Sequence, residues 1–176
     1  MILSDKSILE LLKRKKLIIE PVPLDSDVKC NHINLHLSSR VLKYKVKVLD
    51  LKDNDHSFLV EEFEIPKNGF ELKAGEFLLG STVEKIQIPN GYSGFIETKG
   101  NIARAGIQTH NTDGHIDPGF IGNVTLEIKN NSHHSIVIYP NIAFVQIYFF
   151  KSTSKSINPY NGKYQNQKGA TTYKKD

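Results

Sequence analysis

From residue 33 onward, the sequence is a succession of short segments in which apolar and polar residues alternate or apolar residues cluster. These segments span residues 33–37, 41–49, 63–65, 76–88, 94–98, 124–128, 135–140 and 142–150. Between them stand turn-forming residues, among them Pro66, Gly69, Gly75, Pro89 and Gly91. Alternation with a period of two indicates half-buried strands. Many short strands joined by turns favour an antiparallel sandwich or jelly roll, so we predict a mainly β fold.

A single helix is predicted ahead of the strands. Ser4 is placed to cap it, and Ile8, Leu11 and Leu12 recur at the spacing of one helical face. The EPVP stretch at 20–23 ends the helix, because proline cannot continue it. The chain has 176 residues, no internal repeat and no linker-like stretch. It is therefore expected to form one domain, 1–176.

Charge is distributed unevenly along the chain. The formal net charge is +4, from 23 Lys and Arg against 19 Asp and Glu. Residues 151–176 hold six of these lysines and one of the acids, so the first 150 residues are close to neutral. A near-neutral body has no basic stripe, and a nucleic-acid partner is not expected. Residues 151–176 also have almost no aliphatic side chains, which predicts a mobile segment, although its three tyrosines leave ordering on a ligand open.

Composition and motifs exclude several other classes. No stretch approaches the roughly 20 apolar residues of a membrane span, and the N-terminus lacks the order of a signal peptide. A soluble cytoplasmic protein without a membrane partner is the expectation. Cys30 is the only cysteine, which excludes an internal disulfide and a Cys-rich zinc cage. A zinc deaminase also needs H-x-E and P-C-x-x-C motifs, and neither is in the sequence.

The densest polar stretch covers residues 98–130. Besides five glycines it holds Arg104, His110, Asp113, His115, Asp117 and Glu127. It is either a run of β-turns with solvated charges or a ligand site. Strand alternation places Thr125 and Glu127 opposite the apolar residues of 124–128, on a face that meets either solvent or a polar cavity. In a cavity, a partly desolvated Glu127 with a raised pKa would serve as general base for a bound water.

Four further motifs can be quoted: MILSDKSILELLKRKKLIIEP (1–21), EFLLGSTVEKIQIP (76–89), HNTDGHIDPGFIGNVTLEI (110–128) and GKYQNQKGATTYK (162–174). Together, and in this order, they resemble the dCTP deaminase family of the dCTP deaminase/dUTPase superfamily. The resemblance implies a distorted jelly-roll or β-barrel of the dUTPase-like type, with an N-terminal helix and a mobile C-terminal lid (151–176). It also implies homotrimers with active sites between subunits. The implied reaction is zinc-independent deamination of dCTP to dUTP and ammonia, with Mg²⁺ bound through the triphosphate and dTTP as an inhibitor.

The same resemblance implies roles for individual residues. Glu127, in the T-L-E motif, would take a proton from the water that attacks C4 of cytosine and help protonate the departing ammonia. Arg104, at the far end of the family's R-S-S-x-x-R motif, would position water and substrate. Asp117, in I-D-P-G-F, is expected at the deoxyribose 3′-hydroxyl. The other implied substrate-binding residues are His110, Asn111 and Thr112 near the base, and Tyr160, Lys163 and Gln167 over the triphosphate.

Six positions depart from the family pattern: Asn34 and His36 replace an acid and a base in the strand 33–37, and the other four lie in the polar stretch. Lys99 replaces an arginine and loses the forked guanidinium that pairs with phosphate oxygens. Gly100 and Asn101 replace two serines expected to bind phosphate. Losing one hydrogen bond to a charged group costs about 1.5–3 kcal/mol, which predicts a rate or affinity lower by roughly one to two decades. Asp113 stands where a small residue normally lies beside the cytosine, so it would crowd the base, repel the triphosphate or alter selectivity.

Three functions remain open. The leading one is a deaminase that releases dUTP, because the catalytic residues and the C-terminal motif are retained. The nearest alternative is a bifunctional enzyme that continues to dUMP and diphosphate, because Asp117 sits where dUTPases hold a water-activating carboxylate. The third is a non-catalytic nucleotide-binding homologue, suggested by the loss of both serines and by Asp113.

Overall fold

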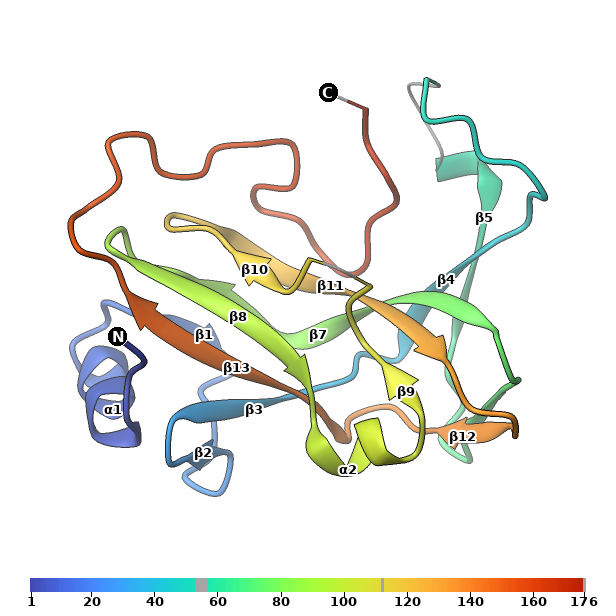
Figure 1. Cartoon of the computed structure of the whole chain (residues 1–176), viewed down its shortest axis with the longest axis horizontal. Coiled ribbons are helices and arrows are strands. Elements are labelled where there is room, and N and C mark those ends of the chain that lie inside the picture. The colour runs from blue at the N-terminus through green and yellow to red at the C-terminus, as the bar shows by residue number, and fades with distance from the viewer. Residues whose placement is uncertain (53–56, 112, 176) are drawn as a thin grey trace.

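Two antiparallel sheets form the body of the molecule (Figure 1). The structure is a computed structural model that describes residues 1–52, 57–111 and 113–175. The first sheet has the order β5 (Val60–Glu64), β4 (Arg40–Tyr44), β7 (Phe77–Gln87), β11 (Ile121–Asn130), β9 (Ile107–Gln108), and β1 (Ile18–Glu20) also pairs with β7. The second has the order β10 (His115–Ile116), β8 (Tyr92–Thr98), β13 (Ala143–Lys151), β3 (His32–His36), β2 (Val28–Lys29). A third, two-stranded sheet joins β6 (Phe70–Leu72) to β12 (Ile136–Ile138), and the predicted mainly β fold is confirmed.

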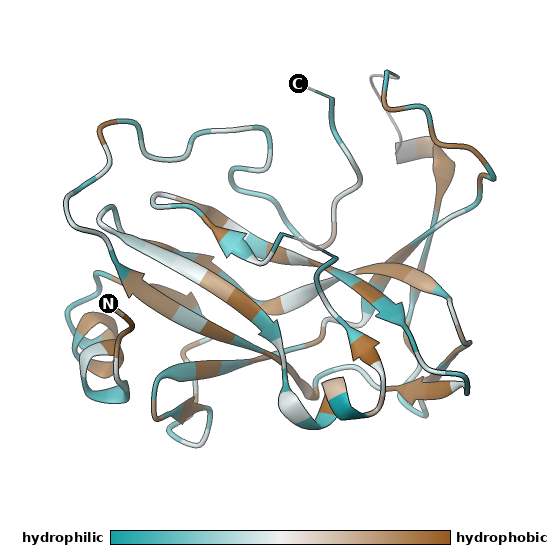
Figure 2. Cartoon of the chain, viewed as in Figure 1, coloured by the Kyte–Doolittle hydropathy of each residue, from teal (hydrophilic) through white to brown (hydrophobic). Residues whose placement is uncertain are grey.

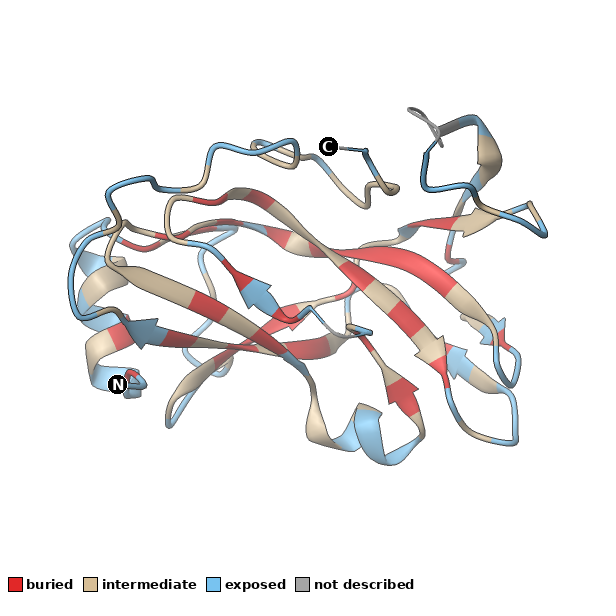
Figure 3. Ribbon diagram, turned by 45° about the horizontal axis from the view of Figure 1, so that its top comes forward, coloured by how far each residue is buried: buried red, intermediate tan, exposed pale blue. Residues whose placement is uncertain are grey.

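The apolar faces of the sheets share one hydrophobic core. Leu35 of β3, Leu78 of β7, Leu126 of β11 and Phe144 of β13 belong to it, and all four side chains are fully buried. Hydrophobic residues follow the strands in Figure 2, and buried residues follow them in Figure 3. Burial of apolar area on this scale is the main force holding the two sheets together.

The predicted N-terminal helix is α1 (Asp5–Lys13), which buries Ile8 against the core. Ser4 stands at its N-cap, and its carbonyl accepts the N–H of Ile8. Its hydroxyl makes no capping hydrogen bond, so the predicted side-chain cap is wrong. None of the helices in the described part of the chain is long and apolar enough to cross a membrane.

Two short helices were not predicted, α2 (Gly100–Arg104) and the 3₁₀ helix η1 (Ser57–Leu59). The α2 helix lies inside the polar stretch 98–130, for which a run of β-turns was one of the two interpretations. Its one turn begins when the carbonyl of Lys99 accepts the N–H of Ala103. It ends before Gly106, whose φ of 100° is a conformation that glycine adopts without strain.

Strand boundaries differ from the prediction in two ways. The segment 41–49 was expected to be one strand, but β4 ends at Tyr44 because its partner β5 begins opposite that residue, at Val60. Residues beyond Tyr44 then connect the two strands. Five strands of only two or three residues, β1, β2, β6, β9 and β10, were missed because so short a segment shows no alternation.

The C-terminal segment, residues 152–175, follows β13 without forming a helix or strand. It crosses the molecule beside β10 and β11 and ends near the β4–β5 connection (Figure 1). The carbonyl of Ile121 accepts the N–H of Asn166, and the carbonyl of Gln167 accepts the N–H of Asn123. The segment that composition predicted to be mobile therefore lies against the body, held by backbone hydrogen bonds to β11.

Candidate active site

Glu127 lies in β11, the strand hydrogen-bonded to β7 on one side and β9 on the other. Leu126 and Ile128 are fully buried in the core, whereas Thr125 and Glu127 are half-buried on the opposite face. The Glu127 carboxylate accepts a hydrogen bond from the backbone N–H of Asn111, with 2.7 Å between Oε2 and N. The predicted alternation is confirmed for residues 125–128, and their second face lines a cavity. Val124, predicted on the buried face, is half-buried and also lines the cavity, next to a register shift in the pairing of β11 with β7.

This cavity has a volume of about 580 Å³ and is bounded by β11, the turn before it and the C-terminal segment. Six predicted site residues line it: Asn111, Asp113, Asp117, Glu127, Tyr160 and Gln167. Three of the six are carboxylates, and the described residues of its wall include no lysine or arginine. The wall therefore attracts cationic groups and repels a polyanion.

The turns on either side of β10 each bring one of these carboxylates to the cavity, Asp113 before the strand and Asp117 after it. Gly114 is buried in the first of these turns, and a Cβ there would lie 2.6 Å from the carbonyl oxygen of Ile96, so only glycine fits. Asp113 accepts a hydrogen bond from the N–H of His115, at 3.3 Å from its Oδ1, within its own turn. Asp117 Oδ1 lies 3.6 Å from His115 Nδ1. Thr112, predicted to meet the base, lies outside the described residues.

The C-terminal segment closes one side of the cavity. Tyr160 packs against Phe120, with 6.0 Å between the ring centroids. The side chain of Gln165 accepts the N–H of Ile121 and donates to the carbonyl of Gly119. These contacts fix the segment on the turn that leads into β11, and they place Tyr160 in the cavity wall as predicted.

The remaining predicted site residues do not line this cavity: Lys99, Gly100, Asn101, Arg104, His110 and Lys163. The first four belong to α2 and its N-cap. The ammonium of Lys99 donates to Oδ1 of Asn101, and Arg104 is exposed in the last turn. Close to this helix, burial and the cations of Lys29 and Lys99 hold the pKa of His32 below its usual value.

His110 and Lys163 lie near the cavity without entering its wall. His110 Nε2 lies 3.1 Å from a carboxylate oxygen of Glu97, and its ring meets that of Phe95 edge-on. Lys163 is exposed on the C-terminal segment, with its ammonium 5.8 Å from the ring centroids of both Tyr164 and Tyr173.

Several residues that line the cavity were missed by sequence analysis. Tyr44 comes from β4, whose sequence gives no sign that this strand approaches β11. Thr171, Thr172 and Tyr173 come from the end of the C-terminal segment. Thr125 was placed on the same face as Glu127 by the predicted alternation, but it was given no role in the site.

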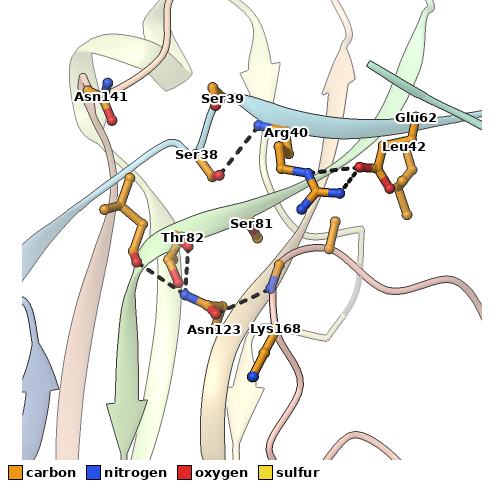
Figure 4. Close-up of a pocket in the computed structure, with 13 residues that line it drawn as sticks. Ser38, Ser39, Arg40, Leu42, Glu62, Ser81, Thr82, Asn123, Asn141 and Lys168 are labelled. Atoms are coloured by element: carbon orange, nitrogen blue, oxygen red, sulfur yellow. Dashed lines mark hydrogen bonds and ion pairs between the residues drawn. The ribbon is translucent and has the colours of Figure 1, made fainter. Parts of the chain in front are cut away.

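A second cavity, of about 380 Å³, is bounded by the next residues of the C-terminal segment, 168–170 (Figure 4). Its walls carry mostly polar side chains, and its guanidinium, from Arg40, is paired with Glu62. That pairing raises the pKa of Arg40. Ser81 contributes a buried hydroxyl without a hydrogen-bond partner in the described structure. No predicted site residue lines this cavity, so the candidate active site is the larger one.

Comparison with known proteins places the sequence among dCTP deaminases. Residues 2–152 match the family model described as dCTP deaminase-like. A Dictyoglomus turgidum protein named "dCTP deaminase, dUMP-forming" is 36% identical over 184 residues, which is 99% of this chain and 94% of the relative. A Mycolicibacterium smegmatis protein of the same name is 35% identical over 181 residues, covering 97% and 94%.

Solved structures agree on the fold. The 2′-deoxycytidine 5′-triphosphate deaminase of Agrobacterium tumefaciens superposes with a TM-score of 0.66 at 22% identity, over 84% of this chain. The match spans 47% of that structure, so this chain has about half its length. The dUTPase of phage phi11 of S. aureus superposes with a TM-score of 0.54 at 12% identity, over 83% of this chain and 96% of the phage protein. The dUTPase-like fold predicted from the sequence is therefore confirmed.

Proposed function

Since the chain belongs to the dCTP deaminase-like family, we propose that it hydrolyses dCTP to ammonia and dUMP, with diphosphate released in the second step. The observation that carries this proposal is that Glu127 and Asp117 line one cavity. Two hydrolyses at different atoms of one substrate call for two carboxylates, one near each reacting atom. The dUMP-forming names of the relatives support this bifunctional reaction over the release of dUTP.

Glu127 is assigned to the deamination. Its Oε2 is held by the N–H of Asn111, which orients the carboxylate and leaves Oε1 to take a proton from water. The water oxygen bonds to C4 of the cytosine, and its first proton passes through Glu127 to N3. Glu127 then moves the remaining proton from the new C4 hydroxyl to the exocyclic nitrogen. The C4–N bond breaks, ammonia leaves and a carbonyl forms at C4. No metal is needed for this step, because the carboxylate generates the nucleophile.

Asp117 is assigned to the second hydrolysis. It is about half exposed at the edge of the cavity, where the sugar and α-phosphate of a nucleotide with its base beside Glu127 would lie. Its carboxylate would hold the water that attacks the α-phosphorus. The bond from that phosphorus to the bridging oxygen then breaks and diphosphate leaves. Mg²⁺ enters with the substrate, bound to the triphosphate.

The charge of the cavity wall supports assembly into the homotrimer that the family resemblance implies. Three carboxylates without a lysine or arginine suit the neutral base and the sugar, and they repel a triphosphate. Lys99, Asn101 and Arg104 supply cations and donors, but they lie on α2, outside the wall. We assign them to the triphosphate of a nucleotide held in the cavity of a neighbouring copy.

Product analysis tests the proposal. Purified protein is incubated with dCTP and Mg²⁺, ammonia is measured, and dCTP, dUTP and dUMP are separated by chromatography. We expect equal amounts of dUMP and ammonia. Glu127→Gln should lower ammonia release by about 10²–10⁴-fold, the usual contribution of a general base. Glu71→Gln, on the exposed edge of β6, is the control and should keep full activity.

Other products would assign one of the alternative functions. Accumulation of dUTP, with no hydrolysis of added dUTP, would show a deaminase that stops at dUTP. Tight binding of dCTP without ammonia release would show a non-catalytic homologue. Inhibition by added dTTP is a separate expectation of the family resemblance and is measured in the same assay.

A further inference from the structure

Thr125 lies on the same face of β11 as Glu127 and contacts the C-terminal segment through its hydroxyl. Its Oγ1 lies 3.3 Å from Nε2 of Gln167 and 3.3 Å from Oγ1 of Thr171. Thr171 Oγ1 in turn lies 2.9 Å from Oε1 of Gln167. The three side chains therefore close a ring of hydrogen bonds, which we call the Thr125 ring, between the strand of the general base and the segment that covers the cavity.

The direction of each hydrogen bond in the Thr125 ring follows from the chemistry of the groups. Gln167 Nε2 also donates to the carbonyl of Asn123, which fixes the orientation of the amide. An amide nitrogen donates and an amide oxygen accepts. Gln167 Nε2 therefore donates to the Thr125 hydroxyl, and the Thr171 hydroxyl donates to Gln167 Oε1. The hydroxyl of Thr125 is then left to donate to Thr171.

The Thr125 hydroxyl is fully engaged by this arrangement. Besides the ring bonds, its oxygen accepts the backbone N–H of Thr171 at 3.2 Å. A hydroxyl has one donor and two acceptor sites, and here all three are directed to the C-terminal segment. Each of these bonds tethers the segment to β11, a strand held in the sheet on both sides.

Gln167 is engaged to the same extent. Both ends of its amide bond to β11 or to Thr171. The family resemblance assigned this residue to the triphosphate, whereas in the described structure its amide holds the segment in place.

We propose that Thr125 is a positioning residue, whose hydroxyl keeps the C-terminal segment closed over the cavity in register with Glu127. The proposal rests on the proposed function for its effect on catalysis, and on the geometry alone for its effect on the segment. Glu127 keeps its own bond to Asn111 when the Thr125 ring is broken. Loss of the hydroxyl should therefore weaken substrate binding more than it slows the chemical step.

Two substitutions separate the hydroxyl from the shape of the side chain. Thr125→Val replaces the hydroxyl with a methyl group and retains a β-branched residue suited to a strand. Thr125→Ser retains the hydroxyl. Amide hydrogen exchange of residues 166–175 reports closure of the segment without any need for activity. We expect Thr125→Val to lower protection there about tenfold and to raise the KM for dCTP about tenfold with kcat within about twofold, and Thr125→Ser to stay near the native protein.

A double-mutant cycle with Thr171→Val tests the Thr125 ring itself. If the two hydroxyls act in one ring, the double variant should lose little more protection than either single variant. Thr153→Val, at an exposed position outside the cavity, is the matched control and should leave protection unchanged. Unchanged exchange in Thr125→Val, or fully additive losses in the double variant, would overturn the proposal. If the native protein does not turn over dCTP, the proposed function fails while the exchange data still decide whether the Thr125 ring holds the segment.

Discussion

The α2 helix and β11 lie at opposite ends of one polar stretch of sequence, and β11 alone of the two lines the candidate active site in the described structure. β11 carries Glu127 into a cavity, where the preceding turn and the C-terminal segment complete the wall. α2 carries Lys99, Asn101 and Arg104 on the surface, outside that wall. The carboxylates of the proposed site therefore line one cavity, whereas the cations of α2 and its N-cap lie outside the described wall of that cavity.

The two regions also differ in how closely they follow the family pattern. The I-D-P-G-F and T-L-E motifs around β11 match the pattern of the family resemblance, with Asp113 as the departure in the cavity wall. At α2 and its N-cap, three successive positions, 99–101, depart from that pattern. The chemistry assigned to Glu127 and Asp117 depends on the region around β11. The proposed binding of the triphosphate depends on α2 and its N-cap. We therefore expect changes near β11 to abolish individual reactions, and changes in α2 to tune affinity.

The largest effect should come from Asp117→Asn. Removing the carboxylate should lower dUMP formation from dCTP by about 10²–10⁴-fold, since the water at the α-phosphorus loses its base. Ammonia release should continue, so dUTP should accumulate in the chromatographic assay. Asp25→Asn, on an exposed loop, is the control. A parallel fall of ammonia and dUMP would show that the two carboxylates do not divide the two steps.

A smaller effect should follow from restoring the serines of α2. A side chain at Gly100 would meet only the guanidinium of Arg104, at 3.1 Å, and that group can move aside. In the double variant Gly100→Ser/Asn101→Ser, one regained hydrogen bond to phosphate should raise kcat/KM for dCTP by about 10–100-fold. The matched variant Gly100→Ala/Asn101→Ala has the same Cβ atoms without hydroxyls and should show no gain. If the serine variant also gains nothing, α2 does not meet the triphosphate.

The difference between β11 and α2 also explains which parts of the fold and of the candidate site could be predicted from the sequence. Around β11 the alternation of 124–128 was long enough to assign the strand, its buried face and the position of Glu127. A one-turn helix such as α2 has no periodicity to detect, and its motif resembles a turn. Tyr44 enters the cavity only because β4 pairs with β7 across the sheet, a contact between residues far apart in sequence. The C-terminal segment is held by backbone hydrogen bonds to β11 and by single side chains such as Gln167, and the composition of the segment gives no sign of either.

The smallest expected effect is a change in the pKa of His32, which lies close enough to α2 to be influenced by Lys99. Burial, then Lys29, then Lys99 lower the pKa of His32 from its usual value of 6.5. The unfolded chain therefore binds more protons at this residue, so its contribution to stability falls as pH drops through that value. Lys99→Met should raise the pKa of His32, and Lys29→Met should raise it more. The pKa is measured by NMR titration of the imidazole, and the His32→Gln variant identifies the His32 signal. Bound diphosphate would offset the charge of Lys99, so adding it should raise the pKa of His32 in the native protein and have little effect in Lys99→Met. If diphosphate shifts the pKa of His32 equally in the native protein and in Lys99→Met, the anion binds away from Lys99. The assignment of α2 to the triphosphate would then be wrong.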